Sequence, residues 1–157
     1  MSEPLKVAIV ITRSTFHTYL VPLGYAYVFS TLKKSGYDLR LFDYSASPES
    51  LDQSFFTDFN DFLPQVVITG TSYRFHNNCP SPTVHSAVDV CKRTKGLDPV
   101  CTTLLIGPLN SMIGEKLILD PHVNAVAVGE PELICDLFCD AVDKGKSLED
   151  VSGIFLE

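Results

Sequence analysis

Hydroxyl side chains and glycines follow several of the apolar segments in this sequence, and these residue types can hold a polar ligand. A hydroxyl both donates and accepts hydrogen bonds, and a glycine lets a ligand approach the backbone closely. The same glycines could instead serve only to turn the chain from a strand into a helix. The residues in question are Thr12, Ser14, Thr69, Gly70, Thr71, Ser72, Gly107, Pro108, Gly129 and Glu130.

The first of these loops, residues 12–18, carries four hydroxyl side chains that could hold a phosphate, as a flavodoxin loop does. It has no glycine, so its backbone is poorly suited to wrapping closely around a phosphate group. The alternative is a solvated loop whose hydroxyls cap the next helix. His17 lies in the same loop and is a weak candidate ligand for a metal ion.

Two cysteines, Cys135 and Cys139, are one helical turn apart in a predicted helix. Their spacing begins the CxxxCxxC motif that holds an iron–sulfur cluster, but Val142 stands where the third cysteine would be. A four-iron cluster of that kind needs three thiolates on one loop. We therefore expect no iron–sulfur cluster in this chain and place both thiols at the border of the buried helix face.

Apolar runs supply the strands that would position these residues. Four runs are continuously apolar, which is typical of strands covered on both faces of a parallel sheet. A fifth run alternates and indicates an edge strand, and a short sixth run ends the chain. The continuous runs are 7–11, 65–70, 103–107 and 125–129, the alternating run is 39–43, and the last is 154–156.

Helical patterns separate the strands. Pro22, Pro48 and Pro131 are each placed to open a helix, Ser81 and Pro82 form a cap and first turn, and a short helix is predicted over 111–119. This order predicts an α/β fold, a doubly wound five-stranded parallel sheet of flavodoxin-like order 2-1-3-4-5. In such a sheet a ligand binds outside the carboxyl ends of the strands.

The composition sets the protein class. The chain has 157 residues, with 12 basic and 19 acidic side chains and a net charge of −7. This length predicts one domain over 1–157, and the acidic balance excludes nucleic acid and anionic membranes as favoured partners. We expect a cytoplasmic protein, because no long apolar run or signal peptide is present and the five cysteines form no disulfide pattern.

Three common α/β functions lack their motifs. A phosphoacceptor receiver needs acidic residues after strand one and an aspartate after strand three, where this chain has Thr12 and Thr71. No GxGxxG follows the first strand, and no Walker A loop is present.

Several segments, taken in order, resemble the cobalamin-binding domain of cobalamin-dependent radical S-adenosylmethionine enzymes. The chain reads PLGYAY at 22–27, LKKSGY at 32–37 and LFD at 41–43, where that family has PLGLAYLA, LKKAGY and RLLD. VVITGTS at 66–72 is similar to its third strand. IGP at 106–108 and GEPE at 129–132 resemble its GGPH and GEGE, and residues 148–154 resemble the segment before its catalytic barrel.

The resemblance implies a cobalamin-binding module that acts as a carrier or as the partner of a separate radical S-adenosylmethionine chain. It implies that residues 148–157 begin the linker to a barrel, and that this chain alone catalyses no radical reaction. The methionine-synthase-like motif DxHxxG, whose histidine binds cobalt, is not present around His17, and radical-enzyme members of the family often lack it. The implied cofactor-binding residues are those of the opening paragraph together with Leu23 and Gly24.

Two alternatives stay open at this stage. A flavodoxin-like protein could bind a flavin, with Tyr73 and Phe75 stacking on its ring. A degenerate domain, with Pro108 and Pro131 closing the site, could serve only in protein association.

Overall fold

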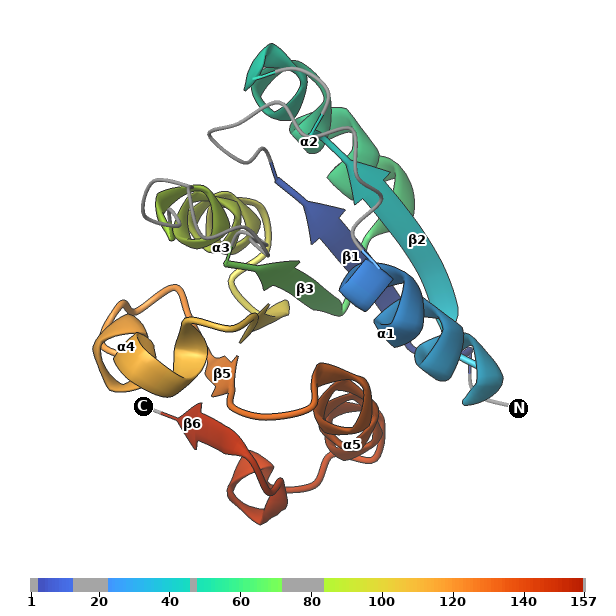
Figure 1. The fold of residues 1–157 in the computed structure, drawn as a ribbon. Helices are drawn as coiled ribbons and strands as arrows, with labels where there is room; N and C mark the ends of the chain where they lie inside the picture. The colour runs from blue at the N-terminus through green and yellow to red at the C-terminus, as the bar shows by residue number, and fades with distance from the viewer. Residues whose placement is uncertain (1–2, 13–22, 46–47, 72–83, 157) are drawn as a thin grey trace.

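The computed structural model describes residues 3–12, 23–45, 48–71 and 84–156. These residues form one six-stranded sheet flanked by five α-helices (Figure 1). The strands are β1 (Lys6–Ile11), β2 (Asp38–Asp43), β3 (Val66–Gly70), β4 (Thr102–Ile106), β5 (Ala125–Ala127) and β6 (Ile154–Leu156). The helices are α1 (Leu23–Lys34), α2 (Pro48–Phe62), α3 (His85–Leu97), α4 (Asn110–Leu117) and α5 (Pro131–Asp143), followed by a short 3-10 turn, η1 (Leu148–Asp150).

The first five strands are parallel in the predicted order β2-β1-β3-β4-β5. The register pairs Ile9 of β1 with Ile68 of β3, and Ile68 with Leu104 of β4. All three side chains are fully buried. Their continuous apolar sequence is explained by the helices that cover both faces of the sheet. The prediction of a flavodoxin-like fold is confirmed.

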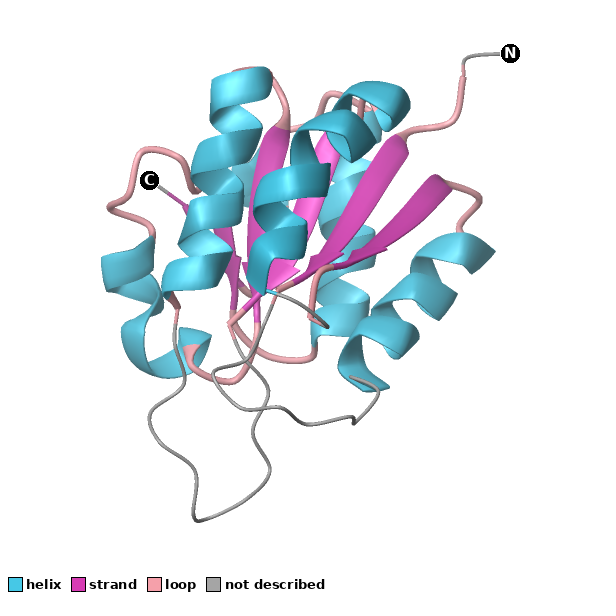
Figure 2. Ribbon diagram, turned by 90° about the horizontal axis from the view of Figure 1, so that it is seen from above, coloured by secondary structure: helices cyan, strands magenta, loops and turns pink. Residues whose placement is uncertain are grey.

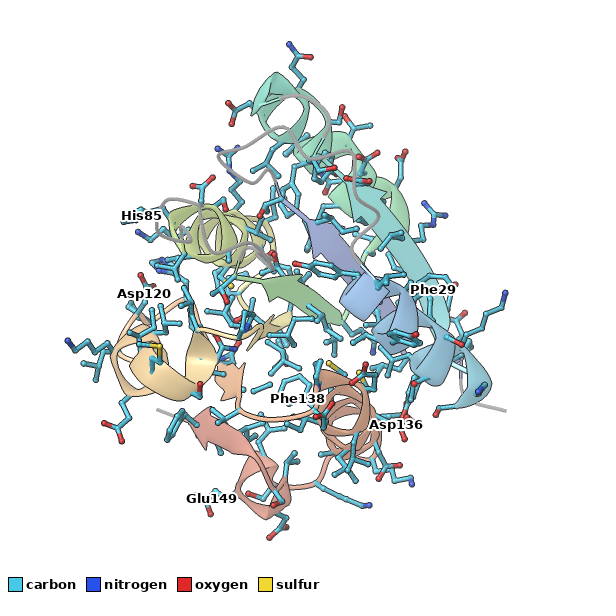
Figure 3. All side chains as sticks on the ribbon, viewed as in Figure 1. Phe29, His85, Asp120, Asp136, Phe138 and Glu149 are labelled. Carbon is cyan, nitrogen blue, oxygen red and sulfur yellow. The ribbon has the colours of Figure 1, made fainter. Side chains whose placement is uncertain are left out.

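The helices divide between the two faces of the sheet (Figures 1 and 2). Helices α1 and α5 pack on one face, where Phe138 points from α5 toward the strands and is fully buried (Figure 3). Helices α2, α3 and α4 pack on the other face, through residues such as Phe59, Val90 and Leu117. We call these the α1/α5 face and the α3 face below.

The sheet is one strand wider than the predicted five. β6 lies beside β5 and runs antiparallel to it, with Phe155 opposite Val126. The amide of Val128 also donates to the carbonyl of Gly153 at 2.7 Å, which extends the pairing beyond the strands. Phe155 packs toward α4, and the ring atom Cδ2 would lie only 2.6 Å from a Cβ added at Gly114.

The helix boundaries differ slightly from the sequence-based ones. α4 begins one residue earlier and ends two residues earlier than the predicted 111–119. Pro22, Ser81 and Pro82 lie outside the described residues. Pro131 is the first residue of α5, as predicted. Among the helices of the described segments, none combines the length and the apolar character that crossing a membrane requires.

Two helical glycines allow the contact between α4 and β6 to be tested. We expect Gly96→Ala to stabilise the protein by about 0.5–1 kcal/mol, because alanine favours a helix over glycine. A Cβ at Gly96 meets no atom within 4 Å. Gly114→Ala gains the same propensity but must displace the Phe155 ring, so we expect a net loss of stability. Urea unfolding measures both, and stabilisation by Gly114→Ala would contradict the packing of β6 on α4.

Candidate functional site

The candidate site is the edge of the sheet at which the parallel strands end (Figure 2). Residues that follow β1, β3, β4 and β5 along the sequence meet at this edge because the four strands are parallel. The predicted residues described there are Thr12, Leu23, Gly24, Thr69, Gly70, Thr71, Gly107, Pro108, Gly129 and Glu130. Ser14, His17, Ser72, Tyr73 and Phe75 lie outside the described residues.

Three threonine hydroxyls lie on the α3 face of this edge. The Thr12 hydroxyl is hydrogen-bonded to the Ser86 hydroxyl of α3 at 3.1 Å. The Thr71 hydroxyl donates to the carbonyl of Ile106 at 3.4 Å, and the Thr71 amide donates to the same oxygen at 2.9 Å. The Thr69 hydroxyl is fully buried and has no hydrogen-bond partner among the described residues. A buried hydroxyl without a hydrogen-bond partner costs free energy. The Thr69 hydroxyl is therefore a donor that a neighbouring acceptor would stabilise.

Gly70 faces the opposite side of the sheet, toward α1. A Cβ added at Gly70 would lie 2.4 Å from the hydroxyl oxygen of Tyr25 and 3.1 Å from its Cζ. Tyr25 itself is only 5% exposed. Gly24 beside it is also buried, whereas Leu23 at the start of α1 is 63% exposed. A tyrosine of α1 therefore fills the space that the missing side chain of Gly70 leaves.

The two other strand-end glycines have different surroundings. Gly107 has φ +129° and Gly129 has φ +125°, conformations that favour glycine. A Cβ at Gly107 would lie 2.4 Å from the Thr71 hydroxyl oxygen and 2.8 Å from the Thr71 carbonyl oxygen. At Gly129 the atom nearest to an added Cβ is Ile134 Cδ1, at 3.5 Å. Gly107 is thus explained by packing within the protein, whereas exposed Gly129 leaves room for an approaching group.

Asn110, at the start of α4, ties β4 and β5 together at this edge, and sequence reasoning missed it. Its side-chain amide donates to the carbonyls of Leu105 and Ala127, both at 2.9 Å. The residue is fully buried, and its Oδ1 has no partner among the described residues. The available signal was an amide side chain directly after Gly-Pro-Leu at a strand end, but the predicted helix began one residue later.

The described cysteines lie in the core, away from any ligand-accessible position. Cys135 and Cys139 are both 0% exposed, so the prediction that they border the buried face of α5 was wrong. They pack with the core beneath α1 and α5. Burial raises the pKa of Cys91 and of Cys101 to about 12, and raises the pKa of Cys135 and Cys139 as well. Such thiols stay protonated and unreactive at neutral pH.

A second concavity lies between α3 and α4, with His85 and Asp120 on its two sides (Figure 3). It encloses about 630 Å³. Two of its charged side chains pair with each other, since Lys92 Nζ lies 3.8 Å from the Asp120 carboxylate. The ring of His122, outside the lining, lies 2.7 Å from the same carboxylate. Burial tends to raise the pKa of Asp120, but the His122 hydrogen bonds and the Lys92 charge outweigh it and lower that pKa.

The described residues contain no group of three or more histidine, cysteine, aspartate or glutamate side chains arranged to hold a metal ion. The strand-end edge therefore offers hydroxyls, backbone amides and the open turn at Gly129 rather than a set of metal ligands. Three exposed apolar side chains, Leu23, Met112 and Leu133, lie in the first turns of α1, α4 and α5, the helices that follow β1, β4 and β5. This arrangement suits a ligand that has both polar and apolar parts.

Known structures share this fold. The radical S-adenosylmethionine methyltransferase TsrM from Kitasatospora setae, solved with tryptophan substrate and a S-adenosylmethionine analogue, superposes with a TM-score of 0.81 at 13% identity over 96% of this chain. The cobalamin-dependent radical enzyme OxsB, solved with aqua-cobalamin and S-adenosylmethionine, gives 0.73 at 16% identity over 97%. This chain spans only 28% of that TsrM chain and 20% of that OxsB chain.

The receiver domain of the Escherichia coli stress response regulator RcsB also shares the fold, with a TM-score of 0.59 at 13% identity over 92% of this chain and 97% of that one. No family model matches the sequence, and no curated protein matches it. At these identities the likenesses establish the fold. They agree with the resemblance to cobalamin-dependent radical enzymes seen in the sequence.

Two asparagines test the role of Asn110. Asn110→Asp replaces the donating amide with a carboxylate facing two carbonyl oxygens, so we expect it to cost more than about 3 kcal/mol of stability at pH 7. Asn124 is the matched control, because its Oδ1 accepts from the Thr103 amide at 3.0 Å. Asn124→Asp keeps that acceptor and should cost about 1 kcal/mol or less. Equal losses in urea unfolding would show that the Asn110 bonds do not hold the strand ends.

Thiol labelling tests the burial of the cysteines. We expect the native chain at pH 8 to react with iodoacetamide at no more than one of its five cysteines, because the raised pKa values keep the four described thiols protonated and burial shields them. In 6 M guanidinium all five should react. Mass spectrometry counts the adducts, and labelling of Cys135 or Cys139 in the folded protein would contradict the packing of α5.

Proposed function

We propose that this chain binds cobalamin at the carboxyl edge of its sheet. The observation that carries the proposal is the fold-wide likeness, with a TM-score of 0.73 over 97% of this chain, to a TsrM structure with cobalamin and a [4Fe-4S] cluster bound. The OxsB structure with aqua-cobalamin supports it in the same way. Three of the family-like segments of the sequence, 66–72, 106–108 and 129–132, reach or follow the ends of β3, β4 and β5.

The described edge fits such a ligand. Cobalamin combines a broad corrin ring with a nucleotide tail that carries a phosphate and a ribose. The exposed apolar side chains Leu23, Met112 and Leu133 in the first turns of α1, α4 and α5 suit the ring, and strand-end hydroxyls and amides suit the tail. Gly129 offers bare backbone with room above it. Cobalt, when bound, supplies methyl-transfer or electron-transfer chemistry.

We further propose that this chain holds the cofactor rather than transforming a substrate. The described thiols are buried and protonated, so they are unsuited to ligating an iron–sulfur cluster. Any radical reaction would then belong to a radical S-adenosylmethionine domain elsewhere, on the same or another polypeptide. Spectroscopic titration with hydroxocobalamin measures cobalamin binding by this chain independently of any radical reaction.

Titration of the purified chain with hydroxocobalamin tests the proposal. We expect one equivalent to bind with micromolar affinity, seen as a shift of the cobalamin absorption bands and as heat in calorimetry. FMN should not bind, which separates a corrinoid site from a flavin site. A chain that gives neither heat nor a spectral change at several hundred micromolar cobalamin would contradict the proposal.

Two glycines provide a matched pair for the same titration. Gly129→Ala and Gly36→Ala each place a side chain at a positive φ, +125° and +90°, and neither added Cβ meets an atom closer than 3.5 Å. The cost in stability should be similar, about 1–2 kcal/mol. Only Gly129 lies at the proposed site, so Gly129→Ala alone should weaken cobalamin binding, by tenfold or more. Equal affinities would place the ligand away from Gly129.

A further inference from the structure

Helices α1 and α5 pack side by side on one face of the sheet and carry opposite charges (Figure 1). The sequence of α1 contains two lysines, Lys33 and Lys34, and no acidic residue. The sequence of α5 contains four acidic residues and no basic one. Within the described segments, neither lysine forms an ion pair. The solvent-facing surface of these two helices, which we call the α1/α5 outer surface, therefore has a basic half and an acidic half.

This outer surface also carries exposed apolar side chains. Tyr27 of α1 is 59% exposed and Leu137 of α5 is 41% exposed. Each lies one helical turn further from the carboxyl edge than the first-turn leucine of its helix, which suits the corrin ring. Tyr27, Ser30 and Lys34 recur at i, i+3 and i+7 and are all exposed, so they form one stripe along α1. Exposed apolar side chains beside complementary charges are typical of a protein–protein interaction surface.

We propose that the α1/α5 outer surface joins two copies of this chain in a homodimer. A two-fold axis that runs along the helices places α1 of each copy against α5 of the other, so the same contact forms twice. The occupant is a second copy because a single chain carries both the basic half and the acidic half of the contact. This arrangement leaves the carboxyl edges of both sheets uncovered at one end of the dimer. The inference is therefore independent of the proposed function.

One hydrogen bond within the chain indicates which charges meet across the dimer. The Ser35 hydroxyl, directly after α1, donates to Asp136 Oδ1 of α5 at 2.6 Å, so the two residues lie level with each other along the helices (Figure 3). Rotation about an axis along the helices keeps every residue at its level. Lys34 of one copy therefore lies level with Asp136 of the second copy, whose other carboxylate oxygen can accept from the ammonium group.

The proposed contact is polar and exposed, so we expect a weak dimer with a dissociation constant of roughly 10–100 µM. Its ionic part is screened by salt. Raising sodium chloride from about 0.05 M to about 0.5 M should weaken the dimer about threefold or more. Sedimentation velocity of the purified full chain without cobalamin measures the dissociation constant under both conditions. A chain that stays monomeric up to about 500 µM at low salt would overturn the inference.

Charge reversal tests the contact itself. Lys34→Glu places a carboxylate level with Asp136 in both contacts of the dimer, so we expect the dissociation constant to rise about tenfold or more. Asp136→Lys should have the same effect. An equimolar mixture of these two variants should regain the wild-type dissociation constant, because both contacts of the mixed dimer then join opposite charges. Any effect of a substitution within its own copy remains in the mixture, so recovery on mixing reports the contact between copies.

Matched variants separate this contact from general changes in charge and hydrophobicity. Successive residues of a helix are about 100° apart around its axis, so Lys33 lies on the flank of α1 away from Ser35. Lys33→Glu should therefore leave the dissociation constant within about threefold of the wild-type value. Leu137→Ser should weaken the dimer, whereas Phe56→Ser, which changes an exposed side chain of α2 on the other face, should not. Circular dichroism and thermal unfolding confirm that each variant is folded.

The remaining outcomes also decide the question. A dimer that neither Lys34→Glu nor Leu137→Ser weakens uses another surface, and the inference is then wrong. Two charge-reversal variants that stay monomeric when mixed would show that Lys34 and Asp136 do not meet, which also overturns it. Should Asp136→Lys fail to fold, the mixture of Lys34→Glu with Asp140→Lys takes its place, because Asp140 lies one turn further along α5.

Discussion

Burial of the central strands on both faces is the constraint on which the other features of this structure depend. Val7, Val10, Val67 and Leu104 are all fully buried, so these strands have no face on which to carry polar chemistry. Polar groups can act only where the strands end, and parallel pairing brings those ends to one edge. The backbone carbonyls at that edge require hydrogen-bond donors. The side-chain amide of Asn110 donates to two of these carbonyls, which explains its position at the start of α4.

The same constraint explains which parts of the fold the sequence reveals. Continuous apolar runs predicted β1, β3, β4 and β5, because two-sided burial leaves that pattern in the residues. The alternating run at 39–43 predicted the edge strand β2, and the alternation of strands with helices predicted the order. The direction of β6 could not be predicted, since Ile154–Leu156 is three residues long and its pairing is set by contacts such as Phe155 with α4. The depth of Cys135 and Cys139 was misjudged for a related reason. Helical periodicity gives the facing of a residue, whereas packing against other elements, chiefly α1, decides how much of α5 is covered.

The site was predictable in its location and less so in its detail. Thr69, Gly70 and Thr71 fall at the expected edge, but a glycine in a sequence does not reveal what replaces its side chain. The structure gives three different answers: Tyr25 fills the space at Gly70, Thr71 fills it at Gly107, and Gly129 is left open. Only the third has the open backbone that the sequence argument assumed for strand-end glycines. Such differences arise from contacts between distant elements, which no local pattern encodes.

One fold serves both receiver domains and cobalamin-dependent enzymes, so the chemistry of the edge must separate them. Carboxylates at strand ends favour a hard cation such as Mg²⁺. The described ends of β1, β3 and β4 carry Thr12, Thr71 and Gly107 with Pro108, none of which is a carboxylate. Hydroxyls, amides and exposed backbone instead suit a ligand that has oxygen acceptors and a large apolar part. Because the groups at the ends of β1, β3 and β4 are neutral, shape rather than charge decides what enters between them, whereas the exposed carboxylate of Glu130 follows β5.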